Sequence, residues 1–317
     1  MEWSQDSLTE LFEKPFFDLL TQAHSIHKQN FNHHEIELCA LINIKTGGCP
    51  EDCGFCNQSA HFKTGLKKES LMPLKDVIEK AKKLKEIGVQ RCCLGAAWRR
   101  PSKRDLPMVL EMVKELKILG FETCVTLGLL DNEQAQELKI AGLDYYNHNI
   151  ESSPEFYPSI VSTHSFQDRI NTVNVVADSN IKVCCGGIVG LGETREDRIH
   201  FFLALTRLKN PPTSIPINRM VPFSQTPLQD VEPLDIFEFI RMIAIARILF
   251  PRSKVRLTGG RKELSDAEQA LCFYAGANSI HVGDMLLTSQ NKSFNSDISL
   301  MKRLNIQPIK PEYMSVD

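Results

Sequence analysis

Short runs of apolar and β-branched residues recur along this chain, and between them apolar residues return every three or four positions. The short runs are typical of buried strands, and the longer stretches are typical of amphipathic helices. Eight strands are expected, with helices in the seven intervals between them, which indicates a parallel α/β fold. The predicted strands are residues 36–44, 91–97, 122–128, 143–150, 181–190, 214–221, 254–260 and 277–283.

The predicted helices carry residues that favour helix ends. "PLKDVIEKAKKLKEIG" starts with Pro73 and stops at Gly88, and its apolar residues have helical spacing. "TREDRIHFFLALTRL" opens on Thr194 with Asp197 three residues later, which is close to a capping box. These signals support a regular alternation of strand and helix.

Eight strands are enough to close a (β/α)8 barrel of the TIM type, and a doubly wound open sheet is the alternative. We expect a single domain over residues 1–317, in which an N-terminal helical extension (1–35) precedes the barrel (36–290) and a C-terminal tail (291–317) follows it. In such barrels the functional residues lie at the C-terminal ends of the strands and in the loops after them.

The composition is that of an ordinary globular protein, with 42% hydrophobic and 24% charged residues. A formal net charge of -2 favours neither nucleic acid nor an anionic membrane as a partner. The first residues lack the features of a signal peptide, and no apolar run approaches the roughly 18 residues that span a bilayer. We therefore expect a cytoplasmic protein. Its ten cysteines then indicate metal, cluster or catalytic roles, because a reducing compartment disfavours disulfides.

Three of the cysteines lie close together in "TGGCPEDCGFCNQS", in the loop after the first predicted strand. Cys49, Cys53 and Cys56 have C-x3-C-x2-C spacing. With His61 they could form a Cys3His zinc site, because structural zinc takes four protein ligands. A [4Fe–4S] cluster ordinarily takes four thiolates, so three cysteines would leave one iron open to a small molecule.

A second group of residues is distributed over the later strands. Cys93, Cys124 and Cys184 lie in the second, third and fifth predicted strands, and Arg256 lies in the seventh. A buried free cysteine is usually a small apolar packing residue. A buried arginine is different, because an unpaired charge in a core is costly, and Arg256 therefore needs an anionic partner. Together the four residues indicate a second cluster site.

The cysteine loop, with Phe55 before its third cysteine, resembles the signature of the radical S-adenosylmethionine enzymes. In that family the open iron binds S-adenosylmethionine, and an electron from the cluster cleaves it to methionine and a 5′-deoxyadenosyl radical. From about residue 40 to 290 the chain further resembles the biotin synthases. The segments that carry this resemblance are "KTGGCPEDCGFCNQS", "GAAWRRP", "TLG", "GLDYYNHNIESSPEFY", "KVCCGGIVGLGETREDR", "PINRMVP" and "VRLTGGRKE".

The resemblance implies a reaction and its participants. Sulfur from an auxiliary [2Fe–2S] cluster would be inserted into dethiobiotin to form biotin, the last step of biotin biosynthesis. The electron would come from a donor such as flavodoxin or ferredoxin, and the protein would be a homodimer. Two alternatives are a related radical enzyme acting on another small substrate and a zinc-stabilised binding module.

The resemblance also implies roles for individual residues. Glu151 stands where the family usually has aspartate, and Gln225 replaces a usual glycine. The implied roles are [4Fe–4S] ligation by Cys49, Cys53 and Cys56, [2Fe–2S] ligation by Cys93, Cys124, Cys184 and Arg256, S-adenosylmethionine binding by Phe55, Asn149, Glu151 and Ile188, and dethiobiotin binding by Asn149 and Asn218.

Overall fold

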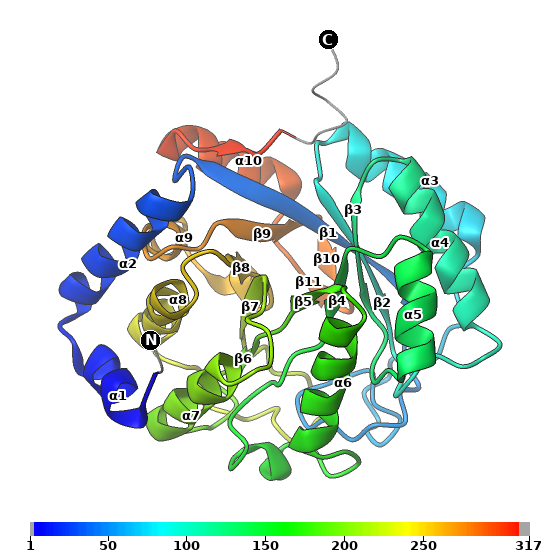
Figure 1. Ribbon diagram of the computed structural model, residues 1–317, viewed down its shortest axis with the longest axis horizontal. Helices are drawn as coiled ribbons and strands as arrows, with labels where there is room; N and C mark the ends of the chain where they lie inside the picture. Colours follow the sequence, from blue (N-terminus) through cyan, green and yellow to red (C-terminus); the bar gives the residue numbers. More distant parts are fainter. Residues whose placement is uncertain (1–2, 311–317) are drawn as a thin grey trace.

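The computed structural model describes residues 3–310, in which parallel strands close into a barrel (Figure 1). β1 (Glu35–Lys45) pairs on one side with β2 (Arg91–Ala96) and on the other with β9 (Ser279–Val282), so the sheet has no open ends. This confirms the predicted (β/α)8 barrel and excludes the open sheet. The strands between β2 and β9 are β3 (Glu122–Thr126), β4 (Tyr145–Asn147), β5 (Lys182–Cys184), β7 (Ser214–Arg219) and β8 (Lys254–Leu257).

The fifth predicted strand is divided in two. β5 ends at Cys184, and the short β6 (Gly187–Val189) pairs with β7 after a break. Gly186 lies in the break, where a Cβ atom would stand 2.0 Å from the carbonyl oxygen of Pro216. Only glycine permits this approach of two backbones.

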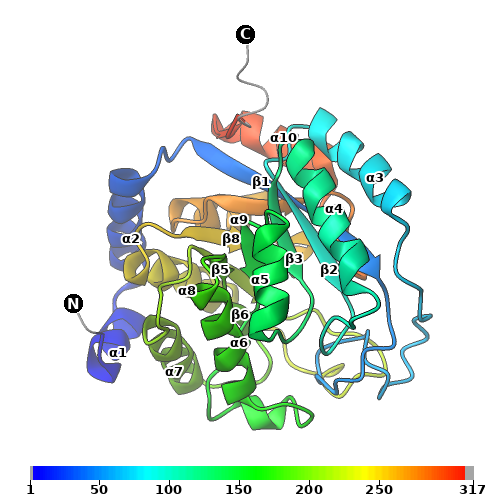
Figure 2. The ribbon, with the colours of Figure 1, turned by 45° about the vertical axis from the view of Figure 1, so that its right-hand side comes forward.

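Within residues 3–310, seven helices follow the strands and form the outer layer of the barrel (Figures 1 and 2). Thr194 and Asp197 form a capping box at the start of α7, as their spacing predicts. α3 begins one residue after Pro73, and Gly88 follows its end with a φ of 78°. The helices are α3 (Leu74–Glu86), α4 (Leu106–Ile118), α5 (Asn132–Ile140), α6 (Phe166–Asp178), α7 (Arg195–Thr206), α8 (Ile236–Leu249) and α9 (Asp266–Tyr274).

The chain adds elements at both ends of the barrel. α1 (Gln5–Glu13) and α2 (Phe16–Asn30) pack beside α7 and α8 (Figure 1). After β9 come a hairpin of β10 (Met285–Leu286) and β11 (Ser289–Gln290), then α10 (Phe294–Leu304) and β12 (Gln307–Pro308). β12 pairs with β1. The described part of the predicted C-terminal tail is therefore packed onto the barrel.

A buried ion pair connects α10 to the loop after β8. Arg261, in a 3-10 turn (Arg261–Glu263), donates from Nη2 to Asp297 Oδ2 at 2.8 Å, and a second bond joins the same two side chains. Neither side chain is more than 2% exposed. The pair ties the C-terminal helix to a loop at the carboxyl end of the barrel.

The apolar core lies mainly between the barrel and its helices. The barrel interior is more polar, because Glu37 from β1, Arg91 from β2 and Arg256 from β8 are all buried there. None of the helices within residues 3–310 is both long and apolar enough to cross a membrane.

Candidate active site

A cavity of about 350 Å³ opens at the carboxyl end of the barrel. Its walls come from the loop after β1 and from the ends of the later strands, where a barrel of this kind carries its functional residues. Cys184 is fully buried and is not part of the lining. The other predicted site residues all line the cavity: Cys49, Cys53, Phe55, Cys56, Cys93, Cys124, Asn149, Glu151, Ile188, Asn218 and Arg256.

Backbone hydrogen bonds close the cysteine loop onto itself. The amide of Cys49 donates to the carbonyl of Gln58 at 2.9 Å, and the amide of Ala60 donates back to Cys49 at 2.7 Å. Between them the amide of Cys56 donates to the carbonyl of Cys53 at 2.9 Å. The three cysteines are therefore held in a compact turn that faces the cavity.

Two acidic side chains anchor this loop to the segment after β4. Asp52 Oδ1 accepts from the amides of Ser162 at 2.9 Å and Thr163 at 3.1 Å. Burial would raise the pKa of Asp52, but hydrogen bonds from the hydroxyl and the amide of Ser162, and then from those of Thr163, outweigh it and hold the pKa well below its usual range. Glu51 Oε2 lies 2.8 Å from Nδ1 of His164. The loop is thus positioned by the fold before any ligand binds.

The chemistry of the three thiols suits a metal cluster. Burial raises the pKa of Cys56 to about 11 and that of Cys53 further, so both are neutral thiols at neutral pH. Metal coordination supplies the positive charge that stabilises buried thiolates. The zinc alternative needs His61 as fourth ligand, but His61 is exposed and its Nε2 lies 3.0 Å from the carbonyl oxygen of Pro50. The three cysteines thus fit a cluster that needs only three protein ligands.

Two of the candidate S-adenosylmethionine residues, Asn149 and Glu151, follow β4 and line the cavity there, while Phe55 belongs to the cysteine loop and Ile188 to β6. Asn149 Nδ2 donates to Glu151 Oε2 at 3.3 Å, and Arg169 Nη1 donates to the carbonyl of Asn149 at 3.1 Å. Burial raises the pKa of Glu151 above its usual value, although the nearby Arg169 opposes this. Glu151 also has a φ of 66°, a left-handed conformation that glutamate seldom adopts and aspartate tolerates better.

Backbone pairing brings Ile188 and Asn218 to the same wall. The amide of Ile188 donates to the carbonyl of Glu151 at 2.9 Å. Asn218 Nδ2 donates to Gly187 at 2.9 Å, and its Oδ1 accepts from the amide of Gly259 at 3.1 Å. Because both ends of the Asn218 amide already have partners, a bound substrate would share them.

The cysteines of the barrel strands lie close together in the barrel interior. Cys93 and Cys124 are in register on β2 and β3, and with Cys184 and Tyr145 they form one buried cluster. The hydrogen bond with Cys124, and to a smaller extent the one with His281, lowers the pKa of Cys93 well below its usual value. Asn147, which the sequence analysis did not select, donates from Nδ2 to Cys184 Sγ at 3.3 Å.

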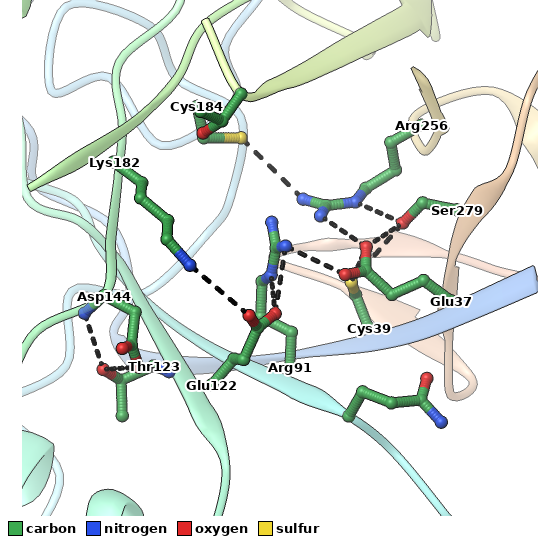
Figure 3. A network of polar contacts seen from close by, with 12 residues as sticks. Glu37, Cys39, Arg91, Glu122, Thr123, Asp144, Lys182, Cys184, Arg256 and Ser279 are labelled. Atoms are coloured by element: carbon green, nitrogen blue, oxygen red, sulfur yellow. Dashed lines mark hydrogen bonds and ion pairs between the residues drawn. The ribbon is translucent and has the colours of Figure 1, made fainter. Parts of the chain in front are cut away.

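Arg256 joins this group from β8 (Figure 3). Its Nη1 lies 3.8 Å from Cys184 Sγ, and its Nε donates to Ser279 Oγ at 2.8 Å. Among the described residues its acidic partner is Glu37, at 3.1 Å, which the sequence analysis did not identify. The sequence did contain an indication of this partner, because Glu37 is the one acidic residue in the apolar run 36–44.

Comparisons with known proteins assign this fold and site to a class. The family model of the Radical SAM superfamily matches residues 43–205, which include the cysteine loop and strands β2 to β6, so the chain belongs to that superfamily. The model of the Biotin and Thiamin Synthesis associated domain matches residues 216–307.

The relatives identify the family more narrowly. Biotin synthase of Coxiella burnetii (strain Dugway 5J108-111) is 54% identical over 305 residues, which cover 96% of this chain and 95% of the relative. Biotin synthase of Brucella ovis is 51% identical over 96% of this chain and 93% of its own. The chain belongs to the biotin synthase family.

Solved structures of lower identity share the fold. A methylornithine synthase superposes with a TM-score of 0.84 at 18% identity, covering 99% of this chain and 96% of its own. The FeFe-hydrogenase maturase HydG from Carboxydothermus hydrogenoformans has a TM-score of 0.84 at 16% identity, covering 98% of this chain and 76% of its own. At these identities the likeness concerns the barrel alone.

Proposed function

We propose that the protein is a radical S-adenosylmethionine sulfurtransferase that converts dethiobiotin to biotin by inserting sulfur between two saturated carbons. The observation that carries this proposal is the meeting of two separate cysteine groups at one cavity. The loop cysteines lie at its rim, while Cys93, Cys124 and Arg256 line it from the barrel strands. One group serves radical formation and the other serves sulfur supply.

The reaction explains why cofactors are needed. The C–H bonds of saturated carbons are not acidic, so no side-chain base removes such protons and general acid–base catalysis is excluded. When bound, a [4Fe–4S] cluster with S-adenosylmethionine supplies a radical that takes hydrogen atoms, and a [2Fe–2S] cluster supplies sulfur. The protein contributes ligands, orientation and exclusion of water.

The loop residues hold the first cofactor in this proposal. Cys49, Cys53 and Cys56 are the ligands of the [4Fe–4S] cluster, and the three-ligand set leaves one iron for S-adenosylmethionine. Phe55 lies between two of these ligands in the sequence and lines the cavity. Its aromatic ring would give the bound cofactor an apolar contact from the loop side.

The opposite wall orients S-adenosylmethionine and the substrate. Glu151 and Asn149 offer a carboxylate and an amide to the ribose hydroxyls, and Ile188 offers an apolar contact to the adenine. Asn149 and Asn218 pair with the ureido group of dethiobiotin, because an amide matches its donor and acceptor pattern. Arg169 holds the backbone of Asn149 and so keeps this wall in place.

The second cluster is held by Cys93, Cys124, Cys184 and Arg256 in the proposal. Three thiolates make the cluster anionic, and a guanidinium beside it offsets that charge. Arg256 Nη1 is the nitrogen that faces Cys184 Sγ. The family also suggests a cytoplasmic homodimer that receives electrons from a flavodoxin or a ferredoxin.

The proposal is tested by anaerobic reconstitution with iron and sulfide, followed by Mössbauer spectroscopy and by measurement of biotin formed from dethiobiotin. We expect both cluster types, and biotin formation that requires S-adenosylmethionine and a reductant. Zinc in place of iron, one cluster type only, or no biotin would refute it.

Matched cysteine variants separate ligands from packing residues. Cys53→Ser should abolish S-adenosylmethionine cleavage and remove the [4Fe–4S] signal while the [2Fe–2S] signal persists. Cys272→Ser is the control, because Cys272 is also buried but lies in α9 among apolar side chains. Cleavage that persists in Cys53→Ser would refute the role of the loop.

A further inference from the structure

One carboxylate lies between two guanidinium groups in the barrel interior (Figure 3). Glu37 Oε1 accepts from Arg91 Nη2 at 2.9 Å, and Glu37 Oε2 accepts from Arg256 Nη2 at 3.1 Å. The side chains of Arg91, Arg256 and Glu37 are 0%, 1% and 4% exposed, so water screens none of these charges. The three strands β1, β2 and β8 contribute one charged residue each.

The contacts of Arg256 leave one nitrogen free for the cluster site. Nη2 is engaged by Glu37, and Nε donates to Ser279 Oγ at 2.8 Å. Ser279 in turn donates to Glu37 Oε2 at 2.6 Å. The guanidinium is therefore held from its Nε and Nη2 side, and Nη1 faces Cys184 Sγ. Without Glu37 only the bond from Nε to Ser279 would hold the plane of this group.

The guanidinium of Arg91 packs on a residue of the same cysteine cluster. Its guanidinium carbon lies 3.5 Å from the ring centroid of Tyr145, which packs with Cys93, Cys124 and Cys184. Within residues 3–310, Arg91 Nη1 is buried and has no hydrogen-bond partner. A buried donor without a partner is costly, so an unpaired Nη1 on a guanidinium that stacks on Tyr145, which itself packs against the three cysteines, indicates an anionic group there.

The charges of this site can be counted. The core of an oxidised [2Fe–2S] cluster carries two positive charges, and three thiolates bring three negative charges, which leaves one negative charge in excess. Arg91, Arg256 and Glu37 together carry one positive charge in excess. With Arg256 counted as a protonated guanidinium that meets the cluster through an N–H group, the two excesses cancel, and the buried site is then neutral only when Glu37 is ionised.

We propose that Glu37 is the positioning residue of the second cluster: it fixes the guanidinium of Arg256 beside Cys184 and makes the total charge of the occupied site zero. This inference rests on the proposed [2Fe–2S] cluster. Removing the negative charge of Glu37 leaves a buried positive excess, which stabilises the reduced cluster. Removing the positive charge of Arg91 does the opposite.

The test is the midpoint potential of the [2Fe–2S] cluster in the anaerobic holoenzyme, measured by redox titration of its visible absorption. Glu37→Gln keeps the shape of the side chain and should raise the potential by more than about 59 mV, a tenfold change in the ratio of oxidised to reduced cluster. Arg91→Gln should lower it. In the double variant the charge is zero again, and the potential should return towards that of the wild type.

Glu122→Gln is the matched control. Glu122 also bonds Arg91, at 3.1 Å, but its side chain is 40% exposed and solvent screens its charge. Its substitution should shift the potential by much less than Glu37→Gln. A purely structural role of Glu37 would not produce opposite shifts in the two single variants or their cancellation in the double variant.

The outcomes are distinguishable. Equal shifts for Glu37→Gln and Glu122→Gln, or single-variant shifts of the same sign, would overturn the inference while leaving the proposed function intact. Absence of the [2Fe–2S] signal from the wild type would instead overturn the proposed function. If Glu37→Gln does not fold, Arg91→Gln and the double variant still decide, because their potentials must then differ with the double variant higher.

Discussion

Replacement of Asp297 by alanine isolates the ion pair that fastens α10 to the barrel. Arg261 would keep its bonds to the carbonyl of His281 at 2.8 Å and to Gln269 Oε1 at 3.0 Å, but it would lose its only acidic partner among the described residues. Both charged side chains lie at 2% exposure or less. The variant therefore leaves a guanidinium buried without a counter-charge.

The size of the effect follows from this burial. Removing one partner of a buried ion pair costs about 3–5 kcal/mol, because the remaining charge stays out of water. At roughly 2 °C per kcal/mol for a chain of this size, the melting temperature should fall by about 6–10 °C. The loop of Arg261 also carries Thr258 and Gly259, which both contact Asn218, so affinity for dethiobiotin should fall as well.

The assay is thermal unfolding of the cluster-free protein followed by circular dichroism. Arg303→Ala is the control on the same helix, because Arg303 and its partner Asp266 are 64% and 46% exposed, and exposed pairs contribute about 0–1 kcal/mol. Replacing both Arg261 and Asp297 by apolar residues of similar volume should regain part of the loss. If Asp297→Ala and Arg303→Ala cost the same, the reasoning from burial is wrong.

Three further predictions concern the backbone and the cysteine loop. Gly186→Ala should prevent folding or lower stability severely, because its Cβ would meet the Pro216 carbonyl oxygen, whereas Gly54→Ala finds its nearest atom at 3.5 Å and should be tolerated in the same unfolding assay. Gln225→Gly should raise the free energy of unfolding by up to about 1 kcal/mol, because Gln225 has a φ of 64° that glycine adopts without strain; a loss of stability would contradict this. For Asp52→Asn, the deficit in unfolding free energy should be full above about pH 4 and should shrink as the pH falls further, because the pKa of Asp52 is depressed only in the folded protein. Urea unfolding at several pH values measures it, and a deficit independent of pH would contradict it.

Much of the architecture followed from local patterns in the sequence. The periodicity of apolar residues in a strand or a helix depends on which face of the element packs against the core, and it can be read from neighbouring residues. Seven of the eight predicted runs therefore each correspond to one strand of the barrel. The family was also accessible, because Cys49, Cys53 and Cys56 lie within one short loop and their spacing is a local property.

The remaining features depend on contacts between residues far apart in the chain. The division of the fifth run at Gly186 is caused by the backbone of Pro216, and the packing of α10 depends on Arg261 meeting Asp297. The spacing of residues in the sequence does not predict such long-range contacts.

The same distinction holds inside the barrel. The need of Arg256 for a negative partner follows from its residue type and its place in an apolar strand, since a buried guanidinium cannot stand alone. The identity of that partner depends on the folded barrel, in which Glu37, 219 positions away, shares its carboxylate between Arg256 and Arg91. Closure of the barrel directs side chains from β1, β2 and β8 into one interior. Charges there are not screened by water, so the charges from separate strands must balance as a group.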